Sequence, residues 1–230
     1  MKFLFLLFAF PFTVSAQQSK STINVSVEGE QQVASVVLFE NEKQTEYTVL
    51  DNKVTIVDSP AHPLLARIVL LYKDWKPKNN IFFFYLVPGS INLKVNTDAN
   101  SISHLTVDGP ELTTEYQTKL LLPISECTQK MDEIEAEIRK GGSDTASLKK
   151  ELNATISKSF GTARDYIKQH PNSPLSIEAL EMMGSGDPTI PVPKRSEDLA
   201  ALYHSLSPNI QNSEAGKQYF ENGLEPLLKQ

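Results

Sequence analysis

The hydrophobic period of this chain changes once, at Gly109-Pro110, from two residues to between three and four. Before that point, from Thr22 to about Asp108, apolar and polar side chains alternate, as they do along Ile23–Val27. Alternation is typical of strands with one buried face, and the longer spacing is typical of amphipathic helices. The sequence therefore predicts an α+β fold, in which an N-terminal antiparallel β-sandwich of about eight strands precedes an all-α helical region.

Three denser apolar runs interrupt the alternating pattern, at Val33–Phe39, Leu65–Tyr72 and Ile81–Val87. Strands that are apolar on both faces are typically buried on both faces. We therefore expect the runs around Ile68 and Phe83 to form central strands. The aromatic run Phe82-Phe83-Phe84-Tyr85 could instead line a ligand groove, but the pattern favours a buried strand.

The apolar positions from Tyr116 to Ile138 recur at spacings of three and four, which predicts a long helix. Thr113 or Thr114 is the expected N-cap of this helix, because threonine side chains accept hydrogen bonds from the first helical N–H groups. Pro123 lies within the pattern and should kink the helix or split it in two, because proline lacks the N–H that the helix needs.

Gly141-Gly142 ends this pattern, and a second one continues to Ile167, so the two helices should form a helical hairpin. Further helices are predicted from Ser173 to Gly184, from Ser196 to Leu206, and from about Ser213 to Leu228.

The N-terminus has the pattern of a secretory signal peptide. Lys2 supplies the positive charge, Phe3–Phe12 the apolar segment, and Val14-Ser15-Ala16 the small residues of a cleavage site. The apolar segment is shorter than the roughly 20 residues that a membrane-spanning helix needs. We therefore expect cleavage near Ala16, a periplasmic or secreted protein without a membrane span, and three segments: 1–16 (signal peptide), 17–110 (β-sandwich) and 111–230 (helical region).

The formal net charge is −6, and no stretch of the chain is strongly basic. Nucleic acids and anionic surfaces attract basic patches, so neither is an expected partner. The four histidines are scattered without metal-ligand spacing, and the sequence contains no hydrolase or nucleotide-binding motif. The sequence thus predicts a protein that is not an enzyme and has no metal, cofactor or catalytic residue.

Cys127 is the single cysteine of the chain and the one candidate redox residue. It lies in the apolar pattern of the first predicted helix, where an unpaired cysteine behaves as a small hydrophobic residue. The alternative is a reactive thiol, which would need exposure and a positive environment, whereas Glu126 is adjacent. We expect the buried, inert state.

Four segments resemble a family of exported proteins that carry the domain of unknown function DUF4369. They are Leu86–Leu93, Val107–Pro110 followed by Glu115-Tyr116, Tyr166–Ser176, and Leu202–Pro208 followed by Asn212-Ser213 and Gly216-Lys217. The order and spacing of the last two segments make them fairly specific.

In this family the region is found N-terminal to a thioredoxin-like domain in oxidoreductases of the Bacteroidetes. The sequence ends at Gln230 and contains no Trp-Cys-x-x-Cys motif. The resemblance therefore implies a fold and a periplasmic location without the family's redox residues. It predicts a non-catalytic binding or accessory module of unknown protein or ligand partner. The alternative is a redox accessory that acts through Cys127 or with a separately encoded thioredoxin-like partner.

Overall fold

The protein is described by a computed structural model that covers residues 20–29, 31–74, 79–97, 103–141, 144–184 and 186–229. Eight strands are followed by helices only, which confirms the predicted α+β fold. The predicted signal peptide lies outside the described residues. No helix in the described ranges is both long and apolar enough to cross a bilayer.

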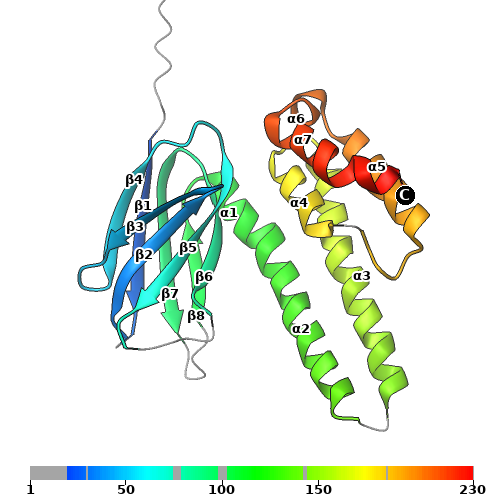
Figure 1. Ribbon diagram of the computed structural model, residues 1–230, viewed down its shortest axis with the longest axis horizontal. Helices are drawn as coiled ribbons and strands as arrows, with labels where there is room; N and C mark the ends of the chain where they lie inside the picture. The colour runs from blue at the N-terminus through cyan, green and yellow to red at the C-terminus, as the bar shows by residue number, and fades with distance from the viewer. Residues whose placement is uncertain are drawn as a thin grey trace, which may run out of the picture.

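The eight strands form two four-stranded sheets (Figure 1). The strands are β1 (Ser21–Glu28), β2 (Val33–Glu40), β3 (Lys43–Thr48), β4 (Lys53–Asp58), β5 (Leu64–Tyr72), β6 (Ile81–Leu86), β7 (Gly89–Thr97) and β8 (Ser103–Asp108). Their order is β4-β1-β7-β8 in one sheet and β3-β2-β5-β6 in the other. Neighbouring strands are antiparallel except β1 and β7, which pair in parallel with Ile23 opposite Ile91.

The two sheets enclose one apolar core, to which alternate residues of their strands contribute. Ile23 of β1 and Ile91 of β7 face it from one sheet, and Leu38 of β2 and Ile68 of β5 face it from the other. All four side chains are almost fully buried. The period-two pattern is therefore the signature of a sandwich in which each sheet has one wet face.

The expectation for the two apolar runs is half right. The run around Ile68 forms β5, a central strand, but the run around Phe83 forms β6, an edge strand. Phe83 is 38% exposed, whereas Tyr85, two residues further on the same face of the strand, is 2% exposed. The difference arises because helices cover the outer face of β6 only at its C-terminal end, where Tyr85 lies.

The helical region begins directly after β8. Its elements are α1 (Glu111–Glu115), η1 (Tyr116–Leu121), α2 (Leu122–Arg139), α3 (Thr145–Gln169), α4 (Leu175–Met183), α5 (Val192–Ser205), α6 (Pro208–Gln211), α7 (Glu214–Tyr219), η2 (Phe220–Leu224) and α8 (Glu225–Leu228). The predicted hairpin is present: α2 and α3 pack as a pair that extends away from the sandwich (Figure 1).

Pro123 does not split the first helix. α1, η1 and α2 follow one another without a break, and the π-helical segment η1 ends two residues before the proline. The last helix repeats this arrangement, since η2 ends at Leu224, two residues before Pro226. A π-helical turn shifts the hydrogen-bond pattern by one residue, which adapts a helix to a proline that cannot donate.

The predicted threonine cap of the first helix is wrong. This helix begins at Glu111, its N-cap is Pro110, and no side chain caps it. Thr113 is fully buried, and its hydroxyl donates to the backbone oxygen of Tyr85 at 2.8 Å. A residue expected to start a helix therefore joins that helix to β6.

Two other predicted helix starts have opposite outcomes. The expectation for Ser213 is confirmed, because its Oγ accepts a hydrogen bond from the N–H of Gly216 at 3.0 Å. The expectation for Ser196 is wrong, since α5 already begins at Val192. Pro191 precedes this start as the N-cap residue, and proline is well suited to the entry of a helix.

A second apolar core fills the helical region, and the sandwich contributes to it. Tyr85 of β6 and Val87, which follows it, pack with Tyr116, Leu120 and other buried side chains of the helices. The neighbouring residue Phe84 points to the opposite face, into the core of the sandwich. The end of β6 is therefore the place where the two cores meet.

Candidate functional site

Cys127 lies on α2 and is 3% exposed, so its predicted burial is confirmed. The same helix carries Lys130, whose Nζ forms an ion pair with Glu151 of α3 at 2.8 Å across the hairpin. The thiol is thus not presented to solvent.

The histidines do not gather around a metal site. Among the described residues, no three His, Cys, Asp or Glu side chains are placed to hold a metal ion. His170 instead stacks on Tyr166, with 4.5 Å between the ring centroids, and its Nδ1 lies 3.8 Å from Glu115.

The two most specific segments of the family resemblance form a packed turn. Ser176 donates its hydroxyl to the backbone oxygen of His170 at 2.7 Å, and the N–H of Ser207 donates to the backbone oxygen of Pro171 at 3.0 Å. The segments Tyr166–Ser176 and Leu202–Pro208 therefore hold each other in place.

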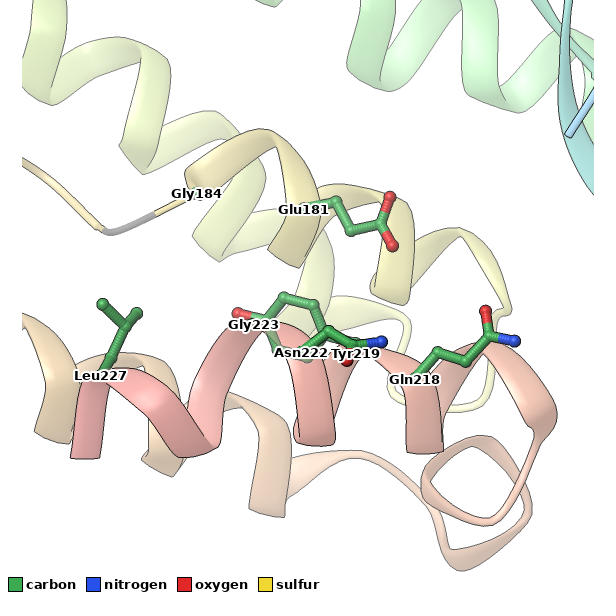
Figure 2. Close-up of a pocket in the computed structure, with 7 residues that line it drawn as sticks. All are labelled: Glu181, Gly184, Gln218, Tyr219, Asn222, Gly223 and Leu227. Carbon is green, nitrogen blue, oxygen red and sulfur yellow. The ribbon is translucent and has the colours of Figure 1, made fainter. Parts of the chain in front are cut away.

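A pocket of about 430 Å³ lies between α4 and the last helix, and we call it the α4–α7 pocket (Figure 2). It is lined by Glu181, Gly184, Gln218, Tyr219, Asn222, Gly223 and Leu227. This volume falls within the range of small-molecule sites in proteins.

Tyr219 contributes a hydroxyl group that lacks a hydrogen-bond partner. The residue is 6% exposed, and its Oη is buried without a partner within the described part of the chain. The side chain belongs to the last helix, which also carries Leu227, and lies on the side of that helix that faces α4 (Figure 2). A buried hydroxyl left unpaired costs about 1–3 kcal/mol, and a ligand atom that reached the Tyr219 hydroxyl would offset this cost.

Two carboxyl groups of α4 give the region its electrostatic character. Glu181 lines the pocket, and Glu178 lies one turn earlier, half-buried beside Tyr85 and Tyr116. Burial, and secondarily the charge of Glu181, raises the pKa of Glu178 to about 7. Partial burial also raises the pKa of Glu181. Within the described ranges, neither carboxylate forms an ion pair with a lysine or arginine.

The tyrosines around these carboxyl groups are held in the neutral form. Burial first, and then the charge of Glu178, raises the pKa of Tyr85 and of Tyr116. Burial together with the charge of Glu181 raises the pKa of Tyr219 to about 12. Neutral phenols both donate and accept hydrogen bonds, so the site has acceptor groups and an uncompensated negative charge.

Local sequence explains how the two walls of the pocket approach each other. Apart from its glutamates, α4 is apolar on nearly every side and is therefore buried in the helical core. It ends at Gly184, which has a φ of 53°. On the other wall, Gly216 places α7 so close to α6 that a Cβ atom would collide with the backbone oxygen of Ile210.

Sequence reasoning missed this site. Its visible signal was two glutamates three residues apart, Glu178 and Glu181, on an otherwise apolar helix. Such a pair lies on one face. Tyr219 gave no comparable signal, because only the packing of α7 against α4 brings it to the pocket.

No known protein family, curated protein or solved structure matches this chain.

Proposed function

We propose that the protein is an exported, non-catalytic binding module that holds its ligand in the α4–α7 pocket. The observation that carries this proposal is the buried, unpaired hydroxyl of Tyr219 in that pocket. The N-terminal signal pattern supports export, and the resemblance to the DUF4369 family supports an accessory role in the periplasm.

Cys127 gives no support to the redox alternative, because a thiol that exchanges disulfides must be accessible. Its side chain is 3% exposed. A separately encoded thioredoxin-like protein stays a predicted partner, and such a partner would have to contact the module through other residues.

Backbone NMR of the purified protein tests the proposal. A panel of small amines, carboxylates, sugars and neutral alcohols is titrated, and we expect at least one class to shift the amide signals of Gly184, Asn222 and Gly223. The variant Asn222→Trp fills the pocket from an exposed position and should abolish the shifts. The control Glu221→Trp, at an exposed residue that does not line the pocket, should retain them. A panel in which no class moves these signals contradicts the proposal.

A further inference from the structure

We propose that the α4–α7 pocket selects an organic cation: a primary ammonium or guanidinium group, either on a free small molecule or on a lysine or arginine side chain of a partner. This proposal rests on the proposed function and adds the chemical class of the ligand.

The first argument is the set of atoms that the pocket offers. Gln218 and Asn222 supply amide oxygens from exposed side chains, and the unpaired phenol oxygen of Tyr219 is buried in the pocket wall behind them. Ammonium and guanidinium groups carry only donors, so they need acceptors of this kind. None of the lining residues in the described ranges is a lysine, arginine or histidine that would compete for them.

The second argument is charge. The Glu181 carboxyl lines the pocket, and Glu178 lies one turn behind it on the same helix. A cation that binds here gains the attraction of the Glu181 carboxylate and, above the raised pKa of Glu178, that of a second carboxylate one turn away. The described part of the chain leaves both groups without a basic partner. An anion would meet repulsion at the same place.

The third argument is the direction of α4. The helix ends at Gly184, which lines the pocket, so the negative end of its dipole lies at the border of the pocket. Cations are stabilised near helix C-termini. Gly184 has open space where a Cβ would be. A ligand can therefore approach the last turn of the helix closely.

Four probes of similar size separate the ligand classes: n-butylammonium, ethylguanidinium, 1-butanol and butyrate. We expect the two cations to shift the amide signals of Gly184 and Gly223, with dissociation constants at least tenfold lower than those of the alcohol and the carboxylate. Nα-acetyl-lysine methylamide distinguishes the two sources. Tighter binding than n-butylammonium assigns the site to a partner's side chain, and weaker binding assigns it to a free amine.

Matched variants test the residues. Glu181→Gln should weaken n-butylammonium binding about tenfold at pH 8, and Tyr219→Phe should weaken it severalfold. Glu221→Gln makes the same charge change outside the pocket and should change affinity less than twofold. Equal or tighter binding of butyrate or 1-butanol overturns the cation assignment and leaves a working pocket. If none of the four probes and no member of the wider panel shifts these amide signals, the binding function itself is overturned.

Discussion

At the scale of single residues, the most informative side chain is Glu178, whose environment opposes its charge. It lies on α4, half-buried beside Tyr85 and Tyr116, and its pKa is raised from 4.5 to about 7. A carboxyl group with a higher pKa in the folded chain than in the unfolded chain destabilises the fold when it is ionised.

The contribution of Glu178 to the stability of the protein should therefore become unfavourable as pH rises from about 4.5 to 7. Between these values the folded chain keeps the Glu178 proton and the unfolded chain releases it, so the penalty is absent below this window and complete above it. Removing the charge in Glu178→Gln should stabilise the protein at pH 8 by about 2 kcal/mol and by less than about 0.5 kcal/mol at pH 4.5.

Urea unfolding at the two pH values measures both effects. The control Glu221→Gln removes an exposed charge and should leave the stability nearly unchanged at each pH. Equal effects of Glu178→Gln at pH 4.5 and pH 8 would show that the residue acts through packing and not through its ionisation.

At the scale of elements, Gly216 fixes the position of the last helix. Its Cα faces the backbone oxygens of Ile210 and Gln211, so that α7 and α6 touch without an intervening side chain. Gly161, on α3, has open space at the corresponding position. Both glycines are helical, but only Gly216 lacks space for a side chain.

Gly216→Ala should destabilise the protein by about 1–3 kcal/mol, because backbone at such a contact yields only with strain. Gly161→Ala should stabilise it by up to about 1 kcal/mol, because alanine favours the helix where nothing obstructs its methyl group. Thermal unfolding followed by circular dichroism compares the variants. A neutral result for Gly216→Ala would mean that α7 can move away from α6.

The elements themselves could largely be predicted from sequence, and their partners could not. Hydrophobic period predicted the strands, the hairpin and the start of the last helix near Ser213, because these depend on local pattern. It failed for β6 and Thr113, whose environments depend on contact between the two regions. Hydrophobic period also could not predict the pocket, since Tyr219 and Glu181 come from separate helices that meet only in the folded chain.

At the scale of the whole molecule, the end of β6 is a main part of the junction between the two regions, and Leu65 of β5 also packs against the helical core there. Tyr85 packs into the helical core, while Phe83, on the same face of β6, remains partly exposed. The hydrogen bond from Thr113 to the backbone of Tyr85 lies at the same junction. The sandwich and the helices therefore stabilise each other at this point.

Substitutions at these two aromatic positions should differ sharply in effect. Tyr85→Ala opens a cavity in the junction and should lower the stability by about 3–5 kcal/mol, whereas Phe83→Ala should cost less than about 1 kcal/mol. Urea unfolding monitored by circular dichroism measures both. Similar losses for the two variants would show that the junction contributes little beyond the burial found elsewhere on the strand.

The parallel pairing of β1 with β7 also orders events while the chain folds. Asn24 and Asn92, which are opposite each other in this pair, are separated by 68 residues. β1 lies between β4 and β7 in its sheet. The sheet can therefore be completed only after β7, which comes late in the chain, is available. Contacts of such long sequence separation form slowly. In the export that we propose, a chain threaded through a translocation channel from its N-terminus thus cannot pair both edges of its first strand until most of the sandwich has emerged.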